Sequence, residues 1–269
     1  LIAGQVDLVL VLLVAVDFFL LRGTRWHGVL IGIAAGIKLT PAAYLLTFLV
    51  GREWRRLFTA AAAGAATVLV GVLVAPGDSL RYWTHLGEET SKSGTPAQAL
   101  FQCWDSLVVR LTNDGSGVLR PPWTLVWLVL VLATVVAGGV VIRSLLSRGA
   151  LVAAVGTNAV VNLLVSPLST MHHWVAALPL FVALAVLAIR GRRPLVGAWV
   201  ALGALLSGVP SWWYLGTSAT WGPWQSLVGS ALVFWAAATL LILFVQRDAL
   251  AHALGRRPAR PVRAVQTGL

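Results

Sequence analysis

The chain has 269 residues, of which 58% are hydrophobic and only 11% are charged, whereas about a quarter of the residues of a soluble domain carry charge. The apolar residues come in long blocks, and about 20 such residues span the hydrocarbon core of a bilayer as a helix. Because backbone groups in lipid must be satisfied internally, and because these blocks do not alternate with polar residues, a soluble fold and a barrel are both excluded. The sequence predicts an all-α membrane protein, a polytopic bundle of about 7–9 hydrophobic segments.

The net charge of +11 is carried almost entirely by arginine. A basic balance can indicate nucleic-acid binding, but arginine clusters at the ends of apolar segments are the pattern of cytoplasmic loops. We therefore expect membrane lipids around the chain and no nucleic acid. The single cysteine, Cys103, excludes an internal disulfide. The arginine clusters are Arg52/Arg55/Arg56, Arg143/Arg148, Arg190/Arg192/Arg193 and two groups in the tail from Arg247 onward.

The first expected element is a helix over residues 1–20, followed by the apolar segment 28–50, which is interrupted by Lys38 and Pro41. Proline breaks the hydrogen-bond pattern of a helix and disfavours the α conformation in the residue before it. Both flanks of the segment are basic. A single straight span would therefore put one basic flank outside, whereas two half-helices would keep both inside, and the charge rule favours the broken pair.

The rest of the chain alternates apolar segments and loops. Helices are expected at approximately 57–75, 123–142, 150–165, 174–189, 195–209 and 226–246. Three connecting stretches without an excess of positive charge are expected on the extracytoplasmic side, at 76–122, 166–173 and 210–225.

Two further expectations concern the parts of the chain outside the apolar blocks. The loop 76–122 is expected to contain short helices, and its stretch PAQALFQCWDSLVVRL shows an apolar face at helical spacing. We divide the chain into a transmembrane module, 1–246, and a basic cytoplasmic tail, 247–269, which is expected to be disordered.

Lys38 stands out because it lies within an apolar segment, too far from Arg25 or Arg52 to reach the interface easily. A cation beside a helix break suits a phosphate held in a cavity. The alternative is an ion pair with an acidic residue of a neighbouring helix, such as Asp7 or Asp17.

His172 and His173 lie in a short outer turn between two apolar helices. Adjacent imidazoles at the mouth of a membrane cavity can bind phosphate, donate to a leaving group or relay a proton. The alternative is that they cap a helix in the interface. No cysteine or carboxylate lies beside them in the sequence, so no metal site is expected. Gln5 and Asp7, at the start of the first helix, could bind a polar substrate or mark the interface.

Three segments together resemble glycosyltransferase family 87, a family of polyprenol-phosphate-mannose-dependent α-mannosyltransferases of the C superfamily. The segments are Gly4-Gln5-Val6-Asp7-Leu8, GIAAGIKLTP at 32–41 and SPLSTMHHW at 166–174. A fourth match is partial: Gln102 and Arg110 keep the spacing of a family pattern in which Asn and Ser flank the Gln, but Phe101 and Cys103 stand at those flanks.

This resemblance implies an inverting transfer on the extracytoplasmic side of the plasma membrane, from a polyprenyl-phosphate sugar to a lipid or glycan acceptor. It implies that His172 and His173 line the catalytic cavity. It also implies that the sugar donor is bound by Lys38, Gln5, Gln102, Arg110, Ser166 and Ser169. The catalytic base would be a carboxylate of an outer loop upstream of Leu1, so we expect the chain to be the C-terminal part of a longer enzyme. No metal, nucleotide or other cofactor is implied.

Other functions remain open at this point. A transporter or flippase for a lipid-linked or polyol substrate would use the same Lys, His and Trp residues, but such proteins are expected to have paired broken helices, and the sequence has one break, at Pro41. An inactive, truncated module is a third reading. A metal-dependent hydrolase is the least supported, because carboxylates are few, and the absence of a phosphate-binding loop motif argues against ATP-driven transport.

Overall fold

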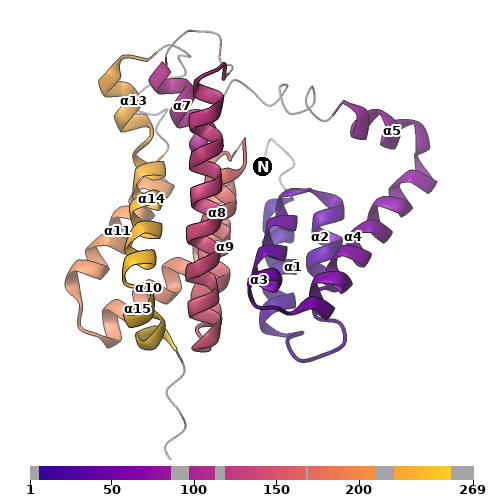
Figure 1. The fold of residues 1–269 in the computed structure, drawn as a ribbon, viewed down its shortest axis with the longest axis horizontal. Coiled ribbons are helices and arrows are strands. Elements are labelled where there is room, and N and C mark those ends of the chain that lie inside the picture. Colours follow the sequence, from indigo (N-terminus) through magenta and orange to yellow (C-terminus); the bar gives the residue numbers. More distant parts are fainter. Residues whose placement is uncertain (1–5, 86–96, 113–118, 168, 210–220, 256–269) are drawn as a thin grey trace, which may run out of the picture.

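The computed structural model describes residues 6–85, 97–112, 119–167, 169–209 and 221–255. Within these ranges the regular elements are helices, accompanied by one isolated β-bridge. Figure 1 shows them as two groups: α1 to α5 on one side and α7 to α15 on the other. The predicted all-α membrane fold is confirmed.

Three stretches of helix are long and apolar enough to cross a membrane: α4 (Trp54–Val74), α8 (Trp123–Ser147) and the run of η2 (Met171–Ala177) into α10 (Leu178–Arg190). A fourth results if α13 (Pro223–Gly229) and α14 (Ala231–Val245), which are bent by 58° against each other, count as one span. Shorter apolar helices are α9 (Leu151–Val165), α11 (Pro194–Gly208) and the 3-10 helix η1 (Thr40–Tyr44) with α3 (Leu45–Val50). The expectation of about 7–9 segments stays a prediction as a count of spans.

The segment 28–50 is a broken pair of half-helices. Helix α2 (Val29–Ile37) ends at Lys38, where the backbone is extended, and the chain continues as η1 and α3. Gly28, which caps α2, lies against Arg56 of α4, and Gly32 and Gly36 within α2 lie against Ala60 and Thr67, so the contacts follow the same order along both helices. The two helices are therefore parallel, so the basic turns that precede them lie at the same end of the molecule.

Helix α1 (Asp7–Phe19) is joined to α2 by a buried carboxylate. The Oδ1 and Oδ2 atoms of Asp17 accept hydrogen bonds from the backbone N–H groups of Gly28, Leu30 and Ile31, at 2.7, 2.8 and 3.1 Å. These amides begin α2 and have no partner within the helix, and a negative charge at a helix N-terminus is favourable. Asp17 thus fixes how α1 meets α2, and with it where the first residue of α1, Asp7, lies.

The stretch 76–122, which is expected on the extracytoplasmic side, contains α5 (Pro76–Thr84) and α7 (Trp104–Thr112). The amphipathic helix predicted over PAQALFQCWDSLVVRL begins only at Trp104. Residues before it lie beside the segment that precedes η2: Phe101 forms an antiparallel bridge with Thr170, the Gln102 N–H donates to the Ser169 carbonyl at 2.7 Å, and the Met171 N–H donates to the Leu100 carbonyl at 3.0 Å. The backbone there pairs with a distant segment, so the local helical pattern is overridden.

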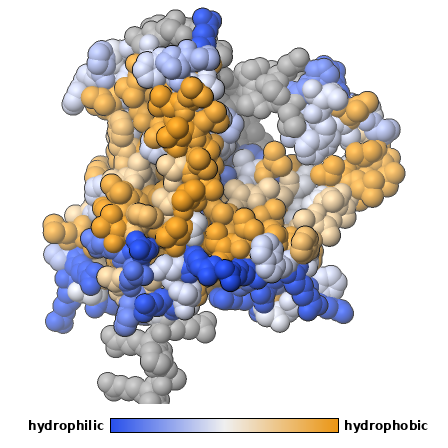
Figure 2. Space-filling model, viewed as in Figure 1, coloured by the Kyte–Doolittle hydropathy of each residue, from blue (hydrophilic) through white to orange (hydrophobic). Residues whose placement is uncertain are grey.

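The arginine-bearing turns gather at one end of the molecule. Figure 2 shows a hydrophilic band there, below an apolar zone, and in Figure 1 the turns before α4, α9 and α11 all lie at this end. The tail begins with a helix, α15 (Arg247–Leu254), in which Leu250 and Ala251 are buried. The expected disorder therefore does not apply to residues 247–254, because these two side chains give the helix an apolar face to pack. Residues 256–269 lie outside the described residues.

Candidate active site

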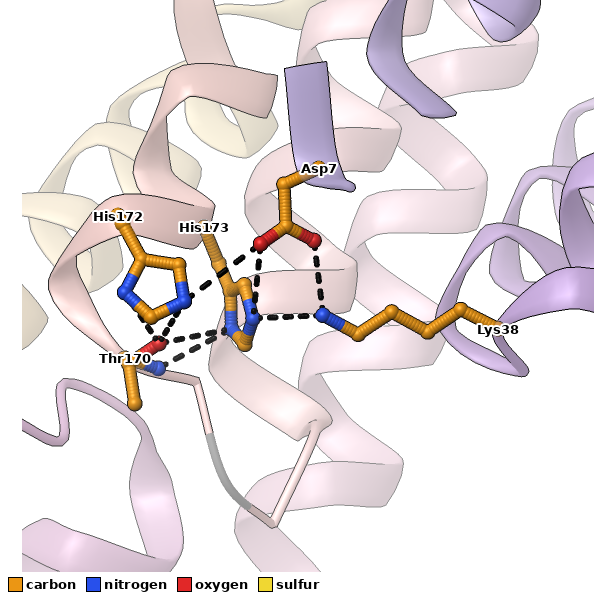
Figure 3. A network of polar contacts seen from close by, with 5 residues as sticks. All are labelled: Asp7, Lys38, Thr170, His172 and His173. Atoms are coloured by element: carbon orange, nitrogen blue, oxygen red, sulfur yellow. Dashed lines mark hydrogen bonds and ion pairs between the residues drawn. The ribbon is translucent and has the colours of Figure 1, made fainter. Parts of the chain in front are cut away.

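A carboxylate at the start of α1, an ammonium group at the end of α2 and two imidazoles of η2 meet in one cluster (Figure 3). The Nζ atom of Lys38 lies 2.8 Å from Oδ1 of Asp7 and 2.9 Å from Nε2 of His173. The Nε2 atoms of His172 and His173 each lie 3.5 Å from Oδ2 of Asp7. The cluster is partly buried, with side-chain exposures of 12% for Asp7, 31% for Lys38 and 17% for His173.

Local structure explains why these side chains converge. Lys38 occupies the extended residue at the break between α2 and η1, which directs it across to the neighbouring elements. Asp7 is the first residue of α1. His172 and His173 lie in η2, directly after Thr170, whose backbone is held by the bridge to Phe101. Residues 97–112, called the outer segment below, thus position the turn that carries both imidazoles.

The hydrogen bonds of His173 define which ring nitrogen carries its proton. The backbone N–H of Thr170 donates to Nδ1 at 3.1 Å, so Nδ1 is the acceptor and the proton of the neutral ring belongs on Nε2. This Nε2–H faces the Lys38 ammonium, another hydrogen-bond donor, with the Asp7 carboxylate beside both. The hydroxyl of Thr170 contacts both ring nitrogens of His172, at 3.1 and 2.9 Å. The arrangement presents several donors to one anion, which at present is Asp7.

A pocket opens beside this cluster. Its walls come from α1, the η1 turn, α9 and the segment that leads into η2. The predicted residues Ser166, Ser169 and His173 line it, together with Asp7. Further lining residues are Leu10, Val11, Val14, Thr40, Pro41, Tyr44, Asn162, Leu163 and Ala176. The lining is therefore apolar on the α1 side and polar where the chain approaches η2.

Two predicted residues, Gln102 and Arg110, lie elsewhere and are 1% exposed each. The Gln102 amide donates to the carbonyls of Ala99 and Gly229, at 2.8 and 2.7 Å. The Arg110 guanidinium donates to the Phe101 and Gly229 carbonyls, at 2.9 and 3.3 Å. Burial lowers the pKa of Arg110 to about 10, so it stays charged. Both side chains hold the outer segment that bridges to Thr170, and neither lines the pocket. Gln5 lies outside the described residues.

Asp7 was expected to bind a polar substrate, to mark the interface or to pair with Lys38. Three residues that contact the cluster or line the pocket were not predicted: Thr170, Asn162 and Tyr44. Asn162 carried a usable signal, because it is a polar residue in an apolar segment, as Lys38 is. The structural alternatives are confirmed for both Lys38, as an ion pair, and His173, as a helix cap, while their roles in substrate binding stay predictions. Lys38 is paired with Asp7 and also faces His173, while the same His173 ring accepts the Thr170 N–H that begins η2.

Asp7, His172 and His173 each offer one possible metal-ligand atom, and these atoms lie within 4.8 Å of one another. A histidine that binds a metal through Nε2 normally donates its Nδ1–H to an acceptor. Here the backbone N–H of Thr170 donates to Nδ1 of His173, which places the ring proton on Nε2. The Lys38 ammonium 2.9 Å from that Nε2 would also repel a cation. The donor set therefore suits an anion better than a metal ion.

Comparison with known proteins gives a consistent result. The profile of glycosyltransferase family 87 matches residues 1–167. A polyprenol-phosphate-mannose-dependent alpha-(1-2)-phosphatidylinositol mannoside mannosyltransferase of Mycobacterium tuberculosis is 34% identical over 246 residues, which cover 89% of this chain and 55% of that protein. The protein of the same name from Mycolicibacterium smegmatis is 33% identical over 262 residues, covering 93% of this chain and 58% of its own length.

A phosphatidylinositol pentamannoside mannosyltransferase of Mycolicibacterium smegmatis, also polyprenol-phosphate-mannose-dependent, is 34% identical over 222 residues, or 77% of this chain and 49% of that protein. No solved structure matches the chain. The chain spans about half the length of the curated relatives it matches. Because the family profile covers more than half of the chain and includes Asp7 and Lys38, the chain belongs to glycosyltransferase family 87.

Proposed function

We propose that the full-length protein is a membrane mannosyltransferase, which moves a mannosyl group from polyprenyl-phosphate mannose to a lipid-linked acceptor. The relatives named above act on phosphatidylinositol mannosides, and an acceptor of this class is the one we propose here. The supporting observation is the distance of 2.9 Å between Nζ of Lys38 and Nε2 of His173. It brings a cation into contact with an imidazole that lines the pocket, although the two residues are 135 positions apart in the chain.

In the proposed reaction an acceptor hydroxyl oxygen bonds to the anomeric carbon as the bond from that carbon to the phosphate oxygen breaks. The polyprenyl phosphate leaves with the bonding electron pair. Lys38, His172 and His173 stabilise the negative charge that develops on it, since preorganised donors act most strongly where charge appears. Ser166 and Ser169 line the pocket that receives the sugar. No metal ion or nucleotide takes part.

The acceptor proton goes to a base on the face of the sugar opposite the leaving phosphate. Asp7 is the one carboxylate among the described residues that line the pocket. It lies 2.8 Å from the Lys38 ammonium, so it is on the side of the phosphate and in the wrong place for this base. We assign the base to the part of the full-length protein outside this chain.

The transporter alternative draws less support. A transporter is expected to build its site from two broken helices that face each other. The structure has a second break, between α13 and α14, but no residue of these two helices lines the pocket. The pocket is lined by Asn162 and Ser166 at the end of α9, whereas the arginine-bearing stretches 52–56 and 143–148 lie at the start of α4 and just before α9. This arrangement supports a pocket that faces the extracytoplasmic side of the plasma membrane.

The test is transfer of labelled mannose from polyprenyl-phosphate mannose by the full-length protein in membranes. Replacing His172 or His173 with Ala, or Lys38 with Met, is expected to lower the rate at least ~100-fold, because each removes a charge-stabilising or proton-carrying group. The matched control is His85→Ala, an exposed histidine on α5, which is expected to keep the wild-type rate. Undiminished transfer in both active-site histidine variants would remove the pair from the site.

A further inference from the structure

Asp7 occupies the position that an anionic ligand would take. One of its carboxylate oxygens contacts the Lys38 ammonium at 2.8 Å. Its other oxygen, Oδ2, is buried and accepts no hydrogen bond from the described residues, although the Nε2 atoms of both imidazoles lie only 3.5 Å away. Buried carboxylate oxygens are normally satisfied. Oδ2 of Asp7 is thus open, although ring nitrogens of both histidines face it.

Charge counting explains what this means for ligand binding. With neutral imidazoles, the charges of Lys38 and Asp7 cancel, so the site is neutral although it is built of donors. A sugar phosphodiester brings one negative charge, which stays constant over the physiological pH range. Without a further proton, that charge would meet the Asp7 carboxylate in a partly buried site, where like charges repel more strongly than in water.

We infer that Asp7 is a built-in competitor for the phosphate of the sugar donor, and that donor binding is therefore accompanied by uptake of one proton on the His172–His173 pair. A protonated His172 carries an N–H on both ring nitrogens, so its Nε2–H faces the open oxygen of Asp7. This contact frees the Lys38 ammonium for the phosphate. The charges then cancel, because the Lys38 ammonium and the imidazolium face the Asp7 carboxylate and the phosphate of the donor. This inference rests on the proposed function, because it concerns the phosphate of the same sugar donor.

The groups that face Asp7 from each neighbouring element are known. Lys38 comes from the end of α2, and His172 and His173 come from η2. Tyr44 and Asn162 line the pocket nearby but carry no charge. Proton uptake by this cluster therefore falls on the imidazole pair. The expected sign follows: protonation favours donor binding, so affinity is higher in acid and falls as the pH rises through the range in which the imidazoles lose their proton.

The experiment measures the dissociation constant of short-chain prenyl-phosphate mannose on the full-length protein in nanodiscs. Between about pH 6 and about pH 8 the wild-type constant is expected to rise by up to about tenfold per pH unit, the limit for one linked proton. A prenyl mannoside without phosphate is expected to bind with no such slope, because it brings no charge.

Asp7→Asn keeps the shape of the side chain and removes its charge, so its dissociation constant is expected to vary less than about twofold over the same range and to be lower than wild type at about pH 8. Asp7→Glu keeps the charge and is expected to keep the slope. Asp78→Asn, the same change at an exposed residue of α5, serves as the matched control with a wild-type slope.

The outcomes separate this inference from the proposed function. If wild-type protein binds the donor and transfers mannose, but with a constant independent of pH, or if Asp7→Asn keeps the wild-type slope, the competitor role is wrong and the mannosyltransferase stands. If neither binding nor transfer occurs at any pH, both ideas fail. Size-exclusion chromatography of each variant in detergent identifies misfolding, and the Asp7→Glu slope then decides the question by itself.

Discussion

His27 is a buried imidazole in the turn between α1 and α2, packed edge-on against the rings of Phe18 and Phe48. Its Nε2 atom lies 3.7 Å from Oδ1 of Asp17, beyond hydrogen-bond distance. Burial, with smaller contributions from the guanidinium groups of Arg56 and Arg22, lowers the pKa of His27 from 6.5 to about 4. The folded protein therefore holds a neutral ring where the unfolded chain would become charged.

This difference predicts a loss of stability in acid. Between pH 6.5 and about 4 the unfolded chain binds a proton at His27 that the folded protein does not, so stability is complete above that window and falls as the pH decreases through it. At about pH 5 the loss relative to about pH 8 is on the order of 2 kcal/mol. Thermal unfolding in detergent, followed by circular dichroism, should show a smaller acid-induced drop in Tm for His27→Phe than for wild type. An equal drop in both proteins would place the acid sensitivity elsewhere.

Individual residues differ in how well the sequence predicted their roles. Lys38 and the His172–His173 pair stood out because polar groups in apolar segments are costly, and the structure brings them into contact. Gln102 and Arg110 followed a spacing pattern, but their partners are backbone carbonyls. Which carbonyl lies near a side chain depends on tertiary packing, and no sequence spacing reveals it.

At the scale of elements, the contact of α2 with α4 depends on small residues. A Cβ atom added at Gly32 would lie 2.2 Å from the Ala60 carbonyl oxygen and 2.7 Å from the Ala63 Cβ. Helix backbones can approach this closely only where side chains are absent, which is the ordinary way that helices associate within a bilayer. The apolar composition predicted both helices and the basic flanks their common direction, but their contact was not predicted, although Gly28, Gly32 and Gly36 recur at every fourth residue.

Gly32→Ala is therefore expected to destabilise the protein by about 1–3 kcal/mol, because the added methyl group forces α2 away from α4. Lys38 at the end of α2 should move with it, so mannosyl transfer should fall as well. Gly77→Ala, on α5 with no atom within 4 Å of the added Cβ, is the control and should be neutral or slightly stabilising. The test is to measure Tm and the transfer rate of both variants. A Gly32→Ala protein as stable as the control would mean that α2 and α4 do not pack this closely.

The outer segment 97–112 is a second element that reaches the site without lining it. Arg110 fixes it by donating to the carbonyls of Phe101 and Gly229, and Phe101 in turn bridges to Thr170 beside the histidines. Removing the guanidinium takes a donor from the Phe101 carbonyl and leaves the Gly229 carbonyl with the Gln102 amide. Arg and Lys are not interchangeable where a fork of donors is used.

Arg110→Met is accordingly expected to lower the stability by about 2–4 kcal/mol and to loosen the turn that carries His172 and His173. Arg110→Lys should restore only part of the loss, whereas Arg81→Met, at an exposed arginine of α5, should change neither stability nor transfer. Limited proteolysis and mannosyl transfer measured together test this. Wild-type transfer in Arg110→Met would show that the outer segment is not needed to hold the histidines.

For the whole molecule, most of the fold could be predicted from the composition and the distribution of charge along the sequence. The apolar blocks predicted the helices, and the arginine clusters predicted which turns lie together, including the broken pair over 28–50. The bend between α13 and α14 and the helix α15 were not expected. Both depend on packing against other helices. In so uniformly apolar a sequence, the packed face of a helix does not differ in hydrophobicity from its other faces, so no periodic pattern reveals it.

Orientation in the membrane is the property of the whole molecule that the proposed function most needs. The single cysteine, Cys103, is buried, so the wild-type protein should not react with a membrane-impermeant maleimide. Thr84→Cys, an exposed position at the end of α5, should be labelled in intact cells. Ser147→Cys, an exposed position in the last turn of α8 beside the arginine-rich turn, should be labelled only in inside-out vesicles, because arginine-rich loops stay in the cytoplasm. The reverse pattern would place the Lys38–His173 pocket on the cytoplasmic side, where a reaction at the extracytoplasmic face could not take place.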